Sequence, residues 1–193
     1  QKFFSKVSTT FIDNQPVQTG IFRINSDVGN ALGIPDLEEE RSVNFSGGVI
    51  LKPFERFQLS VDYFNIQIDD RITLSGDLGE PGSPGAETIR PVLEGTGAST
   101  ASFFTNSIDT NTEGIDVTSK YAALLADGVQ LQLRGAFNWT DTEVTGGPRN
   151  PTKLQADFNT VILPPDDRRA LTEGSLPETT TKLTASLTAG PVD

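Results

Sequence analysis

The sequence predicts an all-β protein, an antiparallel meander of transmembrane β-barrel strands with long extracellular loops and short periplasmic turns. Three observations predict this fold. Five segments alternate apolar and polar residues with a period of two, which is the spacing of a strand whose two faces differ. Short and long connections separate these segments, and aromatic residues lie near the ends of the segments.

The alternating segments define the expected strands. In each segment nearly all odd-numbered positions are apolar and nearly all even-numbered positions are polar. The segments that set this phase are Val43–Lys52, Phe57–Tyr63, Ile115–Tyr121, Val129–Trp139 and Leu183–Leu187. They predict strands near residues 42–52, 57–72, 102–122, 129–143 and 181–189 of one partial barrel that spans residues 1–193.

A strand that crosses a membrane in a barrel turns every second side chain to lipid and the others to the lumen. The candidates for the lipid-facing side are Val49, Leu59, Val61, Val117, Leu131, Leu133 and Phe137. The candidates for the side that faces the lumen and its contents are Gln58, Asp62, Lys120, Gln130, Gln132, Arg134 and Lys182. A soluble β-sandwich also alternates, so an acidic soluble binding module of that type stays open as an alternative.

The connections differ sharply in length. Phe54–Arg56 and Ala122–Gly128 are short, and Gly190-Pro191 begins a third turn. Long loops are expected over residues 13–41, 73–101 and 144–180. Loops longer than about 15 residues are uncommon in a compact soluble domain, whereas short turns at one end and long loops at the other are typical of outer-membrane barrels.

Aromatic residues lie where the expected strands end: Phe57, Tyr63, Tyr121, Phe137 and Trp139. Girdles of aromatic side chains occupy the membrane–water boundary of such barrels. Short helices are expected inside the loops, at Asp27–Leu32 with Ser26 as N-cap and Gly33 as the end, at Ala86–Glu94 and at Asp166–Thr172.

The composition excludes several classes of function. The chain has no Cys and no His, which removes thiol catalysis, Cys-based zinc sites and the usual general base. The net charge of −11 and the lack of a basic cluster argue against nucleic-acid binding. No nucleophile–base pair is found, so we expect no enzyme, no cofactor and no metal. With no Met in 193 residues, the chain is expected to be an internal piece of a longer protein.

Three polar motifs are candidate sites. Asp109–Gly114 resembles the start of a calcium loop, but the twelfth position is Lys120 instead of the bidentate Glu, so we interpret the segment as strand. The acidic runs Glu38–Glu40 and Asp166-Asp167 are expected to be solvated loop faces, with a bridging divalent cation as the alternative. Asp69–Arg71 is expected to form an ion pair that anchors a loop at the rim.

Three phrases carry a family resemblance. Leu37–Ile72 reads LEEERSVNFSGGVILKPFERFQLSVDYFNIQIDDRI, Asn106–Tyr121 reads NSIDTNTEGIDVTSKY, and Gly135–Thr142 reads GAFNWTDT. Each phrase is degenerate, but their order and spacing together resemble the barrel of TonB-dependent receptors. The resemblance covers nearly the whole chain, without the family's plug domain or its last strands.

The resemblance implies an outer-membrane location and energy-coupled uptake of a scarce nutrient, such as a chelated metal, a vitamin or a glycan. The implied partners are the plug domain, the remaining barrel strands, outer-membrane lipid and the inner-membrane TonB complex. Arg134 is the best candidate for a salt bridge to the plug, with a hydrated lumen residue as the alternative. Gly47, Gly48 and Gly135 would let the plug approach the barrel wall or would merely ease strand curvature.

A second hypothesis treats the chain as a self-assembling structural protein. An excised piece of barrel has two unpaired strand edges and an apolar face, and both favour the addition of further strands. Self-association into a fibre, extracellular if the piece is released, is therefore the alternative to a place in a barrel.

Overall fold

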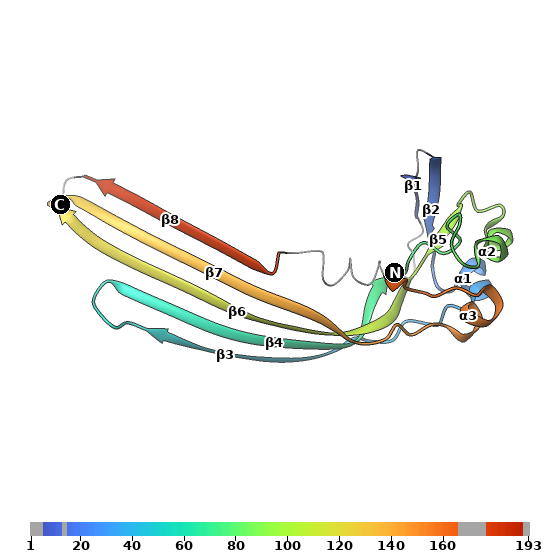
Figure 1. Cartoon of the computed structure of the whole chain (residues 1–193), viewed down its shortest axis with the longest axis horizontal. Helices are drawn as coiled ribbons and strands as arrows, with labels where there is room; N and C mark the ends of the chain where they lie inside the picture. The colour runs from blue at the N-terminus through green and yellow to red at the C-terminus, as the bar shows by residue number, and fades with distance from the viewer. Residues whose placement is uncertain (1–5, 13–14, 166–176, 191–193) are drawn as a thin grey trace. The chain divides into compact units, whose positions relative to one another are not determined.

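The computed structural model describes residues 6–12, 15–165 and 177–190, and its chain divides into two compact units. We call residues 42–67, 111–143 and 172–193 the wall unit. We call residues 1–41, 68–110 and 144–171 the loop unit. Each unit is described by itself below, and Figure 1 gives the labels of the elements.

The wall unit is built on a five-stranded sheet with the order β3-β4-β6-β7-β8 (Figure 1). Apart from β5, which belongs to another sheet, each strand lies beside the next one in the chain, as in a meander. The strands are β3 (Arg41–Leu51), β4 (Phe57–Leu74), β6 (Phe104–Ala126), β7 (Val129–Gly146) and β8 (Thr179–Ala189). The predicted all-β, antiparallel fold class is confirmed.

The register between β7 and β8 keeps the two chemical faces of the sheet in phase. The strands are antiparallel, and Leu131 lies opposite Leu187 on one face while Arg134 lies opposite Thr184 on the other. Because side chains alternate along each strand, a slip by one residue would place Leu187 among the polar side chains. The observed register therefore matches the apolar phase that the sequence sets.

The turn between β6 and β7 is tighter than the sequence analysis expected. Strand β6 continues to Ala126, so the predicted connection Ala122–Gly128 shrinks to Asp127 and Gly128. Gly128 has φ +74°, a conformation that glycine adopts without a steric penalty. Asp-Gly between two apolar runs is a known hairpin signal. The residues before it, 122–126, are all apolar and do not alternate, so the sequence pattern placed the end of the strand too early.

The loop unit contains regular structure where the sequence analysis expected loops. Strands β1 (Lys6–Ile12), β2 (Gln15–Ile21) and β5 (Thr100–Ser102) form a three-stranded sheet in which β1 and β2 are antiparallel and β2 and β5 are parallel. Strands β2 and β5 correct the assignment of 13–41 and 73–101 to loops alone. Strand β2 pairs with the adjacent β1, where Ile12 lies opposite Gln15, whereas β5 pairs with β2 across a long stretch of chain that no local pattern bridges.

Three short helices lie in the described part of the loop unit. The helix α1 (Asp27–Leu32) has the predicted caps: the Ser26 hydroxyl accepts the Gly29 N–H at 3.1 Å, and Gly33 ends the helix at φ +71°. The helix α2 (Ala86–Leu93) ends one residue before its predicted end, and α3 (Thr152–Phe158) was not predicted. The predicted helix Asp166–Thr172 lies outside the described residues.

The loop unit has its own apolar core. Leu32, Ile89, Phe103, Leu154 and Ile162 are fully buried and belong to one cluster, although they come from separate stretches of the chain. None of the helices in the described segments is both long and apolar enough to cross a membrane.

Gly114 in the wall unit supplies a sharp test of sheet packing. A Cβ atom at Gly114 would clash with the ring of Phe64 and would lie 2.6 Å from the carbonyl oxygen of Trp139. We expect Gly114→Ala to lower the free energy of unfolding of the parent protein by about 1–3 kcal/mol, because a backbone atom must shift. Urea unfolding followed by tryptophan fluorescence measures this change.

The matched control is Gly47→Ala, since a Cβ atom at Gly47 meets nothing within 4 Å. The control variant should unfold at the same urea concentration as the wild type, within about 0.5 kcal/mol. Equal destabilisation by both variants would contradict the assigned packing of Phe64 over Gly114.

Candidate functional site

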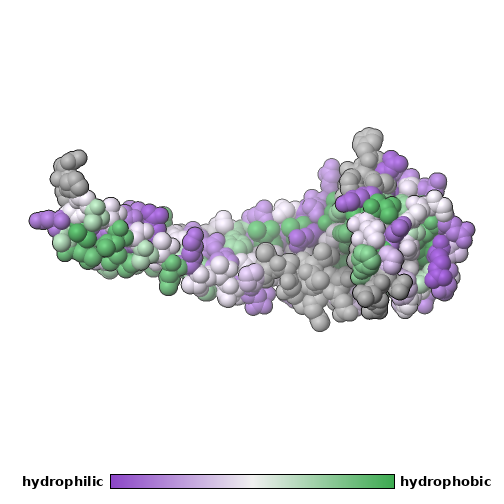
Figure 2. Space-filling model, turned by 90° about the horizontal axis from the view of Figure 1, so that it is seen from above, coloured by the Kyte–Doolittle hydropathy of each residue, from purple (hydrophilic) through white to green (hydrophobic). Residues whose placement is uncertain are grey.

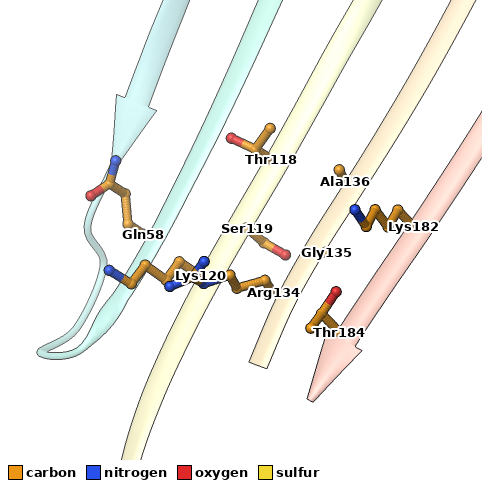
Figure 3. A pocket seen from close by; sticks show the side chains of 9 residues that line it. All are labelled: Gln58, Thr118, Ser119, Lys120, Arg134, Gly135, Ala136, Lys182 and Thr184. Atoms are coloured by element: carbon orange, nitrogen blue, oxygen red, sulfur yellow. The ribbon is translucent and has the colours of Figure 1, made fainter. Parts of the chain in front are cut away.

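The polar face of the wall unit contains a hollow of about 700 Å³ that is lined by residues from β4, β6, β7 and β8 (Figure 3). Most of its lining side chains are at even-numbered positions, which is the polar phase of the sequence. The lining residues are Gln58, Thr118, Ser119, Lys120, Arg134, Gly135, Ala136, Lys182 and Thr184. Residues of four strands therefore share one polar surface in this hollow.

The charged residues that line this hollow are all cations. In Figure 3 the Arg134 side chain extends from β7 toward β6, the Lys120 side chain extends from β6 toward β4, and Lys182 lies on β8. Two carboxylates of the wall unit already have local partners. Asp62 accepts the Ser60 hydroxyl at 2.8 Å, and Asp116 accepts the side-chain amide of Asn138 at 2.7 Å.

The predicted lumen-facing residues divide into two groups. Gln58, Lys120, Arg134 and Lys182 line the hollow, whereas Asp62, Gln130 and Gln132 do not. Asp62 lies against the position where Gly48 would carry a Cβ atom. Gln130 and Gln132 lie opposite Thr188 and Ser186 of β8, in the same phase as Arg134. Thr118 and Thr184 join the hollow although the sequence analysis did not single them out, because hydroxyl residues on a strand carry no distinctive signal.

The other face of the wall unit is apolar and open. Among the predicted lipid-facing residues, Val49, Leu133 and Phe137 are exposed, and Leu59, Val61, Val117 and Leu131 are half-buried. On the edge strand β8, Leu183 and Leu187 are 81% and 64% exposed. Figure 2 shows hydrophobic residues gathered near the short turns of this unit. A contiguous apolar surface of this kind marks an interaction with lipid or protein in natural proteins.

Aromatic side chains cluster at the short-turn end of the sheet. The rings of Phe54 and Phe57 stack with centroids 4.9 Å apart, and Tyr121 meets Phe54 edge-on at 6.4 Å. Along β7 the apolar phase runs from Val129 to Trp139, which corresponds to a height of roughly 25 Å for a strand tilted by about 40°. This height equals that of the apolar band of outer-membrane barrels.

The loop unit contains an ionic network centred on Arg149. Its guanidinium group donates to both carboxylate oxygens of Asp109, at 2.7 and 2.8 Å, and lies 3.4 Å from the Asp70 carboxylate. The Asp70 N–H donates to Asp109 at 2.8 Å, and the Asn106 side chain donates to the Asp70 carbonyl at 2.6 Å. These bonds hold Asp70 at φ +56°, a conformation that is costly outside glycine.

For Asp70 this network differs from the ion pair expected within Asp69–Arg71. Arg71 donates to the Thr110 hydroxyl at 3.2 Å, and Asp70 lies beside Arg149, since adjacent strand residues point to opposite faces. The partner of Asp70 and Asp109 is Arg149, which the sequence analysis did not identify. Its position depends on the hydrogen bond from its backbone N–H to the Ser107 carbonyl, at 2.9 Å, which no local pattern reveals.

The pKa of the Asp109 carboxyl is lowered. Burial alone raises this pKa, but the hydrogen bonds from Arg149 and from the Asp70 N–H, with the positive charge of Arg149, outweigh the effect of burial. The same pairing raises the pKa of Arg149, chiefly through its hydrogen bond to Asp109. Both shifts favour the charged forms of the pair.

The acidic run Glu38–Glu40 is exposed, as expected of a solvated loop face. The Glu38 N–H donates to the Asn106 side chain at 2.8 Å, and a Glu40 carboxylate oxygen accepts the Ile72 N–H at 2.6 Å. The calcium-like segment Asp109–Gly114 lies within β6. No group of three or more potential metal ligands occurs in the part of the chain that the structure describes. Asp166-Asp167 lies outside that part.

The three strand glycines have different surroundings. A Cβ atom would be free at Gly47, would meet the Asp62 carboxylate at Gly48, and would lie 2.8 Å from the Ser119 hydroxyl at Gly135. Close packing within the sheet therefore accounts for two of the three glycines.

The family of this chain follows from a family model. The model of the "TonB dependent receptor-like, beta-barrel" domain matches residues 4–190. The chain belongs to this family. Members of the family are receptors and transporters, so the chain is not an enzyme. No curated protein matches the sequence.

Two solved structures resemble the chain. One is a structure of the RagAB peptide transporter, with 18% identity and a TM-score of 0.45 over 76% of this chain and 14% of that one. The other is the RagAB peptide importer in a closed-closed state, with 16% identity and a TM-score of 0.44 over 75% of this chain and 13% of that one. The chain thus spans about a seventh of the length of the RagAB chains that it matches.

The Arg149 network predicts a pH-dependent stability of the loop unit. The native pKa of Asp109 is below its ordinary value of 3.8, so its contribution is fully present above that pH and is lost as the pH falls through the native pKa. We expect Arg149→Gln to destabilise the segment 144–165 by about 1 kcal/mol at neutral pH, since Arg149 is partly exposed. Hydrogen exchange of the parent protein from pH 6 to pH 3 measures the difference.

The matched control is Lys153→Gln, which removes an exposed pair with Asp157 at 2.7 Å on α3. This variant should lose only about 0.3–0.5 kcal/mol. A wild-type advantage over Arg149→Gln that grew as the pH was lowered below 3.8 would contradict the role assigned to Asp109.

Proposed function

We propose that this chain forms part of the barrel wall of an outer-membrane TonB-dependent receptor that takes up a scarce nutrient, such as a chelated metal, a vitamin or a glycan. The observation that carries the proposal is the pair of unlike faces on the wall sheet. Leu133 and Phe137 are exposed on one face, while Lys120 and Arg134 line a polar hollow on the other. Membership in the receptor family supports the same role.

In this proposal the apolar face contacts lipid and the polar face lines the lumen. Exposed leucines such as Leu183 and Leu187 are unfavourable in water, and contact with lipid hydrocarbon removes that cost. The polar residues of the hollow would then contact the plug domain or water. The inner-membrane TonB complex would act on the plug of the parent receptor, as the family implies.

The strand edges support a place among further strands. In the five-stranded sheet β3 and β8 are the edge strands, and all eleven residues of each are exposed. Within a bilayer an unpaired edge is untenable, because each free N–H and C=O group costs several kcal/mol. The remaining strands of the parent would pair these edges and close the barrel.

The same edges motivate the second candidate, self-assembly of the chain into a fibre. A released chain would add copies through β3 and β8, with apolar faces stacked against each other. Electron micrographs of the isolated chain test this candidate. Dispersed particles alone would rule it out, and the barrel proposal would be unaffected.

Charged substitutions test which face meets lipid. Leu131→Arg places a cation on the proposed lipid-facing side near the middle of the apolar band, so we expect it to destabilise the parent barrel by about 2–4 kcal/mol in lipid vesicles. Gln132→Arg, one residue away on the polar face, should change the stability by less than about 1 kcal/mol.

The measurement is urea unfolding of the intact parent in vesicles, with heat-dependent migration on gels as a check of barrel formation. Equal tolerance of both substitutions would contradict the lipid assignment. A parent protein that stays soluble and monomeric without detergent would contradict the proposed function altogether.

A further inference from the structure

The loop unit contains a hollow of its own, which we call the loop hollow. Its volume is about 590 Å³, within the range of sites that bind small molecules. Its lining comes from stretches of the loop unit that are far apart in the sequence. The charged residues of the lining are Asp36, Glu38, Asp70, Arg149 and Lys153.

Hydrogen bonds fix the walls of the loop hollow. The Asn106 side chain accepts the Glu38 N–H at 2.8 Å and donates to the Glu38 and Asp70 carbonyls, at 3.0 and 2.6 Å. The Arg149 N–H donates to the Ser107 carbonyl at 2.9 Å, which attaches the third stretch to β6. The lining is therefore held in place by the fold of the loop unit, and a ligand has little to order when it binds.

The two cations of the lining already have acidic partners. The Arg149 guanidinium lies 2.7 Å from the Asp109 carboxylate and 3.4 Å from that of Asp70. The Lys153 ammonium lies 2.7 Å from the Asp157 carboxylate. The positive charges of the loop hollow are thus balanced within the protein.

Two carboxylates of the lining have no such balance. Asp36 and Glu38 are exposed, and neither carboxylate forms a hydrogen bond or an ion pair with any described residue. Glu38 makes its hydrogen bonds to Asn106 through its backbone alone. Two negative charges that line one hollow repel each other, and a cation between them relieves the repulsion.

A buried hydroxyl group gives an independent indication of a ligand. Thr105 lines the loop hollow and is only 4% exposed. Among the described side chains, its Oγ1 is the one buried polar atom without a hydrogen-bond partner. Such a group costs free energy, and valine would fill the same space without that cost. A donor on a ligand in the hollow would satisfy the Thr105 hydroxyl.

The lining indicates the chemical class of this ligand. An anion would find only cations that are already paired. A metal ion is a poor match, because no group of three or more potential metal ligands occurs in the described ranges. Ammonium and guanidinium groups supply both the positive charge that Asp36 and Glu38 attract and the N–H donors that the Thr105 hydroxyl accepts.

We propose that the loop hollow binds an organic cation that carries ammonium or guanidinium groups, such as a polyamine. Asp36 and Glu38 pair with its positive groups, and the Thr105 hydroxyl accepts one of its N–H groups. The site needs only the fold of the loop unit, so the proposal goes beyond the proposed function and does not depend on it.

The test measures the binding of spermidine to the intact parent receptor in a non-ionic detergent by titration calorimetry. The variant D36N/E38Q should weaken binding about tenfold, as expected for the loss of two partly exposed ion pairs. The matched control E39Q/E94Q removes two exposed carboxylates of the loop unit that do not line the loop hollow. The control should bind spermidine as the wild type does.

Thr105→Val separates a binding role of Thr105 from a structural one. We expect spermidine affinity to fall about tenfold, because a hydrogen bond from a charged donor is lost. The urea midpoint of the parent should stay the same or rise, since the hydroxyl has no partner within the described residues. An unchanged affinity in Thr105→Val would overturn the role of this hydroxyl as a ligand acceptor.

A comparison of ligands on the wild-type parent decides the proposal even if the variants fold poorly. Spermidine should bind, whereas an uncharged diol of the same chain length and inorganic phosphate should not. Equal binding of the diol, binding of phosphate in place of spermidine, or equal losses in D36N/E38Q and its control would each overturn the site.

The two proposals fail in distinguishable ways. If the parent does not insert into outer membranes as a heat-modifiable barrel, the proposed function fails and the loop hollow is unaffected. If the parent inserts normally but does not bind spermidine, only the cation site fails.

Discussion

The structure depends on the register of strands whose two faces need opposite surroundings. Leu131 faces Leu187 on the apolar side, and Arg134 faces Thr184 on the polar side, so one slipped residue would exchange the two environments along a whole strand. A slipped pair could form the same number of backbone hydrogen bonds, so the side chains and not the backbone specify this register. The meeting of Arg134 and Thr184 in the hollow follows from that alignment.

The two units differ in how far they bury their apolar side chains. The loop unit buries Phe103, Ile89 and Leu154 completely in a core of its own. The wall unit leaves Leu183 and Phe45 exposed, at 81% and 65%. One chain therefore combines a unit with a buried core and a sheet that leaves large apolar side chains exposed.

The charged residues of the two units also differ in their partners. In the loop unit the positively charged Arg149 pairs with Asp109 and Asp70, and these ion pairs connect segments that are far apart in the sequence. In the polar hollow Lys120 and Lys182 have no such partners among the described residues. Paired charges stabilise a local fold, whereas unpaired charges on a shared surface are available to a partner. This contrast distinguishes a structural cluster from a surface for recognition.

The sequence by itself determined the all-β class, the phase of the two faces and the caps of α1 at Ser26 and Gly33, because each depends on neighbouring residues. It did not reveal β5 or the partner of Arg149, since these depend on contacts between residues far apart in the chain, and it also missed β2 and α3. The close packing of Phe64 over Gly114 and the meeting of Lys120, Arg134 and Lys182 also arise only when strands align. Periodicity is a local property, but which side chains meet across strands is decided by register, and register is a property of the folded sheet.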